Sequence, residues 1–248
     1  MQALSPKYTE LNNIKTSLKN AGYCVLDAST VAHWLHCATE ELNVLSPSWD
    51  DLPYDNFLKD GGRYRRRRHS SSIFENQSLT QVPHRAHWQS LDFNALHGGI
   101  ERWFEPIPDV TVSQSAWSKI LLKLVQIASE LRGAHEKRWC IEAHQFRIDT
   151  TGGIGRPTPE GAHRDGVDLV AVFLVKRQDI KGGETRVFDV NDSNGERFTL
   201  TEPWSVLLLD DARMVHETTP IQPLEKEGYR DTLVITLRAN DFQNPVHS

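Results

Sequence analysis

The sequence predicts a mainly β fold, an antiparallel sandwich or roll with helices on its outside. Two observations predict it: long helical periodicity is confined to residues 1–140, and short apolar segments separated by Gly, Asp and Asn turns follow over residues 141–240. The 248 residues show no internal repeat and can bury a sizeable core. We therefore expect a single domain over residues 1–248, in which a helical and loop-rich part precedes the β core.

Three stretches of the first part have the apolar spacing of helices. The first covers residues 8–20, and the second runs from a cap at Ser29 or Thr30 to the break at 46–48. The third and longest covers residues 115–132, and Gly133 is suited to its C-terminal end. Such a helix is expected to back a sheet.

Between the second and third helices, residues 46–110 are rich in Pro, Gly, Asp and Asn, which predicts irregular structure, short strands and a lid over any site. Later segments have the length and turn boundaries of strands. Within 141–150, Gln145 and Arg147 share one face, and His144 lies on the other. The expected strands are 23–26, 141–150, 167–175, 184–190, 197–201, 204–209, 213–218 and 231–238.

Composition excludes several classes of function. The net charge of -5 gives no reason to expect nucleic acid or an anionic membrane as partner. Cys24, Cys37 and Cys140 are scattered and form no CxxC pair, so neither a disulfide framework nor a zinc site is indicated. No apolar run approaches the roughly 18 residues of a membrane span. The N-terminus lacks the pattern of a signal peptide, so we expect a cytoplasmic protein.

One stretch, residues 159–166, carries the chemistry. His163 and Asp165 are two residues apart, so in an extended segment both side chains leave the same face. A distant histidine, His216, would complete a 2-His-1-carboxylate triad, which binds Fe(II) and leaves positions open for oxygen chemistry. Asp211 is better interpreted as a turn residue than as a substitute ligand.

The motif Pro159-Glu160-Gly161-Ala162-His163-Arg164-Asp165-Gly166, followed by Gly182-Gly183-Glu184-Thr185, then by His216 and Arg230, resembles the Fe(II)/2-oxoglutarate-dependent dioxygenases. More closely, it resembles the bacterial branch that includes the L-isoleucine dioxygenases, which hydroxylate free aliphatic amino acids. The resemblance covers about residues 140–240. It implies a double-stranded β-helix (the cupin-like jelly roll), and Fe(II), 2-oxoglutarate and O2 as cofactors, with His163, Asp165 and His216 as metal ligands.

The resemblance also implies a cation for the distal carboxylate of 2-oxoglutarate. Arg230 is the candidate, since arginine recognises carboxylates with two parallel hydrogen bonds, and Thr232 follows two residues later. Arg238 lies at the far end of the same strand and is the weaker choice. Gln145 is a further candidate for cofactor binding, on the strand before the metal motif.

Four residues are candidates for substrate binding. Arg147 would hold a carboxylate or pair with a neighbouring acid, and Glu160 would accept from an ammonium group or brace its loop. Tyr64 and Arg65 belong to the basic run 63–68, whose alternate side chains would face opposite sides in a strand. A solvated surface strand is the alternative for this run.

By resemblance, the expected activity is hydroxylation of a small molecule, a free aliphatic L-amino acid such as isoleucine, leucine or methionine. A peptide or a natural-product intermediate is the alternative substrate. A non-redox cupin enzyme and a non-enzymatic ligand sensor are the alternatives to the oxygenase, although a cupin isomerase has no need of Arg230. Halogenation is disfavoured, because the enzymes that perform it usually lack the carboxylate that Asp165 supplies.

Overall fold

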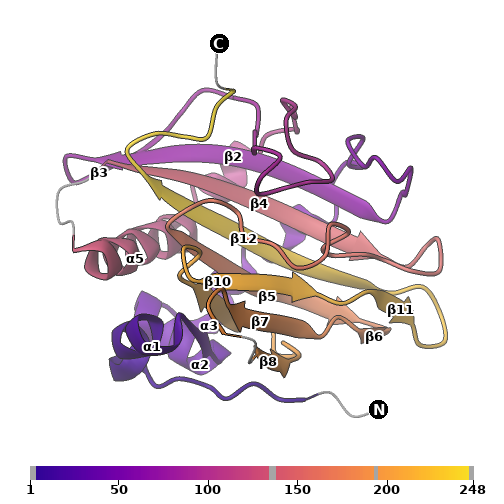
Figure 1. Ribbon diagram of the computed structural model, residues 1–248, viewed down its shortest axis with the longest axis horizontal. Coiled ribbons are helices and arrows are strands. Elements are labelled where there is room, and N and C mark those ends of the chain that lie inside the picture. The colour runs from indigo at the N-terminus through magenta and orange to yellow at the C-terminus, as the bar shows by residue number, and fades with distance from the viewer. Residues whose placement is uncertain (1–3, 134–137, 193–194, 246–248) are drawn as a thin grey trace.

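A seven-stranded antiparallel sheet forms the larger layer of the molecule (Figure 1). The computed structural model describes residues 4–133, 138–192 and 195–245. Most of the strands that the sequence predicts lie in this sheet, with ends shifted by a few residues. In spatial order they are β1 (Tyr23–Leu26), β9 (Val206–Leu209), β5 (Leu169–Gln178), β12 (Tyr229–Ala239), β4 (Trp139–Asp149), β2 (Arg65–Glu75) and β3 (Ser78–Gln81).

A smaller layer packs against the part of this sheet that contains β1, β9 and β5. It consists of β10 (Met214–Thr218), β7 (Thr185–Asp189) and β8 (Gly195–Phe198), beside the pair β11 (Ile221–Pro223) and β6 (Ile180–Gly182). Apolar side chains of β5 and β9 pack against those of β7 and β8 between the layers. The sequence did not predict β3, β6 or β11, which have only three or four residues each.

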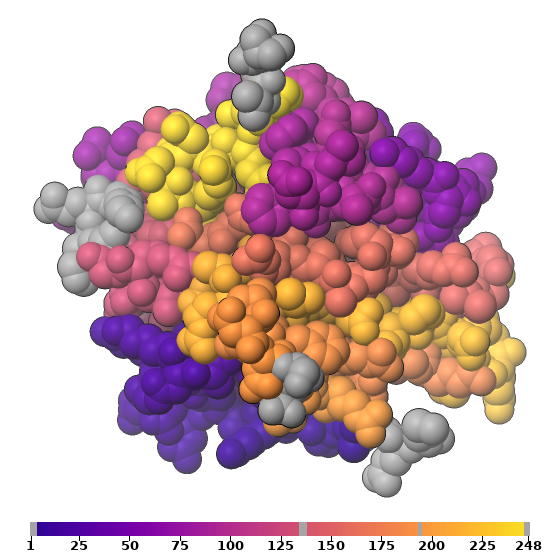
Figure 2. Space-filling model, in the orientation of Figure 1, coloured from indigo at the N-terminus to yellow at the C-terminus, as the bar shows by residue number. Residues whose placement is uncertain are grey.

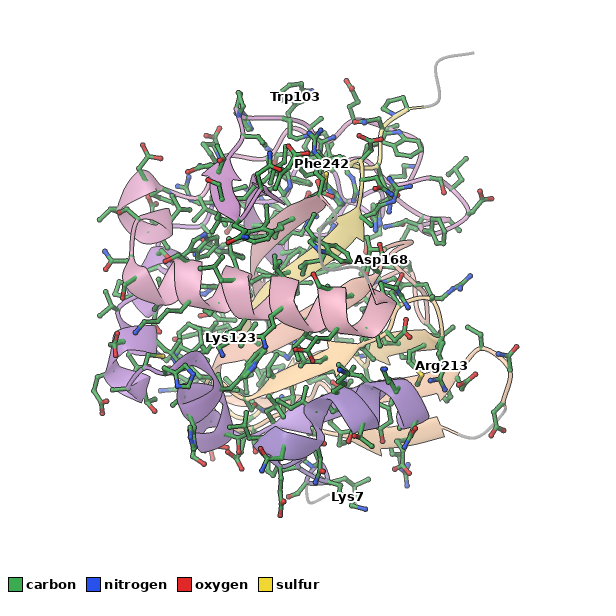
Figure 3. The ribbon with its side chains drawn as sticks, turned by 90° about the vertical axis from the view of Figure 1, so that its left-hand side faces the viewer. Lys7, Trp103, Lys123, Asp168, Arg213 and Phe242 are labelled. Atoms are coloured by element: carbon green, nitrogen blue, oxygen red, sulfur yellow. The ribbon has the colours of Figure 1, made fainter. Side chains whose placement is uncertain are left out.

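Helices cover the outer face of the large sheet. Figure 3 shows α5 (Ser115–Arg132) lying across it, as the spacing of its apolar residues predicts. Its buried side chains join one core with those of β4, β5 and β12. None of the helices in the described ranges is long and apolar enough to cross a membrane. The other helical segments are η1 (Leu11–Asn13), α1 (Ile14–Ala21), α2 (Ala28–Leu35), α3 (Thr39–Asn43), η2 (Ser46–Trp49) and α4 (Asp109–Val112).

The predicted second helix is divided in two. Helix α2 begins after Asp27, whose carboxylate accepts a hydrogen bond from the backbone N–H of Thr30 at 2.7 Å, so neither Ser29 nor Thr30 is the cap. It ends at His36, which adopts a left-handed conformation with φ of 49°. The apolar spacing continues through this break, which is why the sequence did not reveal it.

The basic run 63–68 does not form the solvated surface strand that was its alternative interpretation. It opens β2, which pairs with β4 over ten residues inside the sheet. Arg65 and Arg67 are buried on the inner face, and the side chains of Arg66 and Arg68 are more exposed, so the predicted alternation is confirmed. Buried charges need partners, and the carboxylate of Asp55 lies 2.7 Å from Nε of Arg65 and 3.7 Å from Nη1 of Arg67.

Candidate active site

The three predicted metal ligands converge in the space between the two layers. His163 lies in the loop before β5, and His216 lies on β10; their backbones exchange two hydrogen bonds of 3.0 and 2.9 Å. The nearest donor atoms of His163, Asp165 and His216 all lie within 4.8 Å of one another. Two imidazoles and one carboxylate from one side form the facial donor set that suits Fe(II).

Hydrogen bonds orient this cluster. Nδ1 of His163 lies 2.9 Å from the carbonyl oxygen of Gly161, which leaves Nε2 for a metal. The carboxylate of Asp211 accepts backbone N–H bonds from Asp165, Gly166 and Val167, at 3.0, 2.7 and 3.0 Å. Asp211 is therefore outside the ligand cluster and holds the loop that carries Asp165.

Arg230 points into the same pocket from β12, beside Thr232. Its side chain is almost fully buried, with 3% of the residue exposed, and among the described residues its Nε and Nη2 have no hydrogen-bond partner. Burial lowers the pKa of Arg230 to about 10, and nearby Arg177 adds to this, so the group remains a cation near neutral pH. A buried guanidinium with two unpaired nitrogens is suited to a carboxylate brought by a ligand.

Comparison with known proteins agrees with this geometry. The model of the 2OG-Fe dioxygenase family matches residues 46–236, which is most of the chain. The chain belongs to this family. A search of curated proteins finds no match. Since family members use Fe(II), 2-oxoglutarate and O2, the dioxygenase has these as its cofactors, and the triad and Arg230 fit the metal and the distal carboxylate.

Solved structures give a similar result. A bsmA homologue from Methylobium petroleophilum PM1 is 46% identical, with a TM-score of 0.92, over 99% of this chain and 100% of that one. IDO from Bacillus thuringiensis is 18% identical, with a TM-score of 0.75, over 94% and 100% of the two chains. The Fe(II)/α-ketoglutarate-dependent dioxygenase TqaL is also 18% identical, with a TM-score of 0.72, over 94% and 90%. At this identity the last two support the fold alone.

Two predicted site residues lie on the wrong face of β4. Gln145 and Arg147 follow the side of the strand that packs against the helices, and neither lines the pocket. Gln145 donates to Oγ of Ser48 at 2.6 Å, and Arg147 forms a two-bond ion pair with Asp231, with N–O distances of 2.8 and 2.7 Å. The prediction that they face the pocket is wrong; His144, on the opposite face of β4, lines the pocket but lies outside the metal triad.

Of the other three residues predicted to bind substrate, two line the pocket and one does not. Tyr64 points away from the pocket, where its hydroxyl donates to Asp60 at 2.8 Å, so its prediction as a substrate residue is not supported. Arg65 and Glu160 both line the pocket. In the part of the chain that the structure describes, Nη2 of Arg65 and Oε2 of Glu160 are buried without a hydrogen-bond partner. Oε1 of Glu160 lies 3.6 Å from Nε2 of His163.

Sequence reasoning missed several polar residues that line the end of the pocket under β2 and β4. They come from the inner faces of these strands and from the segment 84–104, which borders the loop of the metal ligands in the space-filling view (Figure 2). Alternation along β2 could have revealed Arg67, but no periodicity marks the residues of the irregular segment. The missed residues are Arg67, His87, Gln89, Asn94, Arg102, Glu142 and His144.

Three histidines gather at this end, around Glu142. One oxygen of Glu142 lies 3.2 Å from Nε2 of His69 and 3.3 Å from Nδ1 of His87, and Arg67 donates to Nδ1 of His144 at 2.8 Å. The three rings come close enough for a metal, with ligand atoms within 4.8 Å. However, a guanidinium can only donate, so Nδ1 of His144 is the acceptor and Nε2 of the neutral ring carries the hydrogen, which leaves His144 no free lone pair for a metal. The charge of Arg67 also opposes a bound cation, so the cluster is better suited to binding polar groups as neutral imidazoles.

This cluster predicts that acid weakens the fold. Burial lowers the pKa of His87 to about 4, helped by Arg102 and Arg67 and opposed by Glu142. As the pH falls from 6.5 to 4, His87 therefore becomes protonated in the unfolded chain before it does so in the folded protein. The free energy of unfolding consequently decreases as the pH falls through this window. His87 alone should account for about 3 kcal/mol.

Denaturant unfolding of the metal-free protein at a series of pH values measures this loss. His87→Gln should flatten the pH dependence of the unfolding free energy. His33→Gln, on helix α2, is the control and should leave it unchanged. Equal slopes for the parent and His87→Gln would contradict the prediction.

Proposed function

We propose that this dioxygenase oxidises a C–H bond of a free L-amino acid with an aliphatic side chain, the substrate class that the family resemblance implies. The observation that carries the proposal is a set of unsatisfied charged groups in the pocket of the metal triad. Among the described residues, Arg102 has no carboxylate partner within 4.0 Å; its Nη2 donates only to the amide of Gln89, at 2.9 Å. A substrate carboxylate would complete this site.

The ammonium group of an amino acid has a candidate partner in the same pocket. Oε2 of Glu160 is buried, lines the same pocket and lacks a partner in the described structure. Arg65 also lines this pocket; its Nη2 has no hydrogen-bond partner among the described residues, while its Nε is held by Asp55. A zwitterion matches one cationic and one anionic contact. Phe146 and Val167 supply apolar lining for a side chain.

The protein's own part in the reaction is binding, orientation and exclusion of water. When bound, Fe(II) and 2-oxoglutarate activate O2 and supply the oxidant for an unactivated C–H bond, with release of succinate and CO2. Arg230 would hold the distal carboxylate of 2-oxoglutarate, and the segment 84–104 would close the other end over the substrate. The same family membership supports a double-stranded β-helix as the description of the two layers.

Succinate release tests the proposal. The Fe(II)-loaded protein receives 2-oxoglutarate, air and each of the twenty amino acids, and the oxidised product is detected by mass. One or a few aliphatic L-amino acids should raise succinate about tenfold above background. The primary amide of the same amino acid should not, because a hydrogen bond to a charged partner contributes about 1.5–3 kcal/mol.

A matched pair of arginine variants locates the carboxylate. Arg102→Leu should raise the KM for the amino acid by about 10- to 100-fold, the kinetic equivalent of that lost hydrogen bond. Arg66→Leu should leave it unchanged, because Arg66 points to the outer face of β2, where it donates to the hydroxyl of Tyr54 at 2.8 Å. Succinate formation with peptides but with no free amino acid would overturn the proposal and favour the alternative substrate class.

A further inference from the structure

Gln89 connects the substrate end of the pocket to a metal ligand. It lies in the segment 84–104 and is buried, with 6% of the residue exposed. Its Nε2 donates to Oδ1 of Asp165 at 3.1 Å. The same segment is braced by paired backbone hydrogen bonds between His87 and Arg102, of 2.9 and 3.0 Å, so the position of Gln89 is well defined.

The orientation of the Gln89 amide is set from its other side. Its Oε1 accepts from Nη2 of Arg102 at 2.9 Å and from Nδ2 of Asn94 at 3.1 Å. A flipped amide would turn N–H groups toward these two donors and an oxygen toward the Asp165 carboxylate, losing all three hydrogen bonds. Because a guanidinium can only donate, the amide has one acceptable orientation.

That orientation determines what Asp165 presents to the metal. Gln89 engages Oδ1, while Oδ2 lies 3.8 Å from Nε2 of His216. A hydrogen bond to one oxygen fixes the rotation of the carboxylate and favours ligation through the other oxygen, as outer hydrogen-bond partners do at metal sites. We propose that Gln89 is a positioning residue that orients Asp165 for metal binding, and that Arg102 and Asn94 hold Gln89 in place for this task.

Gln243 is a natural control for this proposal. Its Nε2 also donates to the metal-ligand loop, to the backbone carbonyl oxygens of Asp165 at 2.7 Å and Gly166 at 3.1 Å. It therefore stabilises the loop without touching the carboxylate. A merely structural role for Gln89 predicts the same effect for both glutamines, whereas a positioning role predicts different effects.

Titration with Co(II) separates the two roles without a substrate. Gln89→Leu should weaken Co(II) binding by about tenfold, the lower end of the cost of losing an outer hydrogen-bond partner. It should also change the visible absorption of bound Co(II), which reports ligand geometry. Gln243→Leu should stay within about threefold of the parent, with an unchanged spectrum. Arg102→Leu, which removes one support of Gln89, should shift the spectrum in the same direction by less.

Folding of each variant is checked by thermal unfolding of the metal-free protein. If Gln89→Leu does not fold, Gln89→Asn keeps the amide but is one methylene too short to reach from Arg102 to Asp165, and it should show the same loss. Parent-like Co(II) affinity and spectrum in a folded Gln89 variant would overturn the proposal, and so would equal changes in the Gln89 and Gln243 variants. These outcomes concern the metal site alone, so they are independent of the amino-acid substrate.

Discussion

Replacing Asp165 with alanine is expected to abolish succinate formation from 2-oxoglutarate. The variant leaves His163 and His216 as a two-histidine site that lacks the charged donor of the triad. Loss of an outer hydrogen-bond partner already costs 10- to 100-fold in metal affinity or activity, so loss of the carboxylate ligand should cost more than about 100-fold. Fe(II) affinity and succinate release, measured on the same preparation, should fall together.

The fold should survive this substitution. Among the described residues, the carboxylate of Asp165 makes one hydrogen bond, to Gln89. Burial raises the pKa of Asp211, and repulsion from the carboxylate of Asp165 raises it further. Its removal relieves this repulsion in the metal-free protein. Asp241→Ala, at an exposed position after β12, is the control and should retain activity. Succinate formation in Asp165→Ala at the parental rate would remove Asp165 from the metal site.

The order of the ligands along the chain and their local spacing predicted the metal cluster. The contacts that hold it together differ in part from those that the sequence argument assumed. The sequence argument assumed that His163 and Asp165 lie on one face of an extended segment. In this segment only His163 makes a β-bridge. The turn around Asp165 is held by hydrogen bonds from backbone N–H groups to the side-chain carboxylate of Asp211. The residue predicted as a simple turn former thus secures the geometry that strand alternation was expected to supply.

The substrate end of the pocket was beyond sequence reasoning for two physical reasons. Strand β4 is buried on both faces, so its alternation places Gln145 and Arg147 together but does not indicate which face meets the pocket. That choice depends on the helices, which cover the face of Gln145. Gln89 and Arg102 lie in an irregular segment, where position is set by contacts distant in sequence and no periodicity exists to interpret.

Replacing Arg230 with leucine is expected to weaken the binding of 2-oxoglutarate without lowering the stability of the fold. The lost guanidinium would otherwise form a two-bond, charge-assisted contact with the distal carboxylate of 2-oxoglutarate, so the KM for 2-oxoglutarate should rise by about 100-fold. The fold should not suffer, because two nitrogens of Arg230 are buried without a partner in the described residues, and Arg177 repels it. Removing an uncompensated buried charge is neutral or stabilising.

Thermal unfolding with and without 2-oxoglutarate measures both effects. The parent, loaded with Co(II), should gain stability as 2-oxoglutarate is added, and Arg230→Leu should not, since a ligand stabilises only in proportion to its occupancy. Arg230→Lys keeps the charge but not the planar fork, so it should be intermediate.

Arg238→Leu is the matched control for Arg230→Leu. Arg238 lies at the far end of β12, where it donates to the backbone oxygen of Asp241 at 2.7 Å, and its replacement should leave the KM for 2-oxoglutarate unchanged. A parental KM in Arg230→Leu would contradict the assignment of the carboxylate site. A large loss of stability in the cosubstrate-free variant would instead show that Arg230 supports the fold. The KM for 2-oxoglutarate and the stability of the cosubstrate-free variant therefore distinguish a ligand-binding role of Arg230 from a structural role in the sheet.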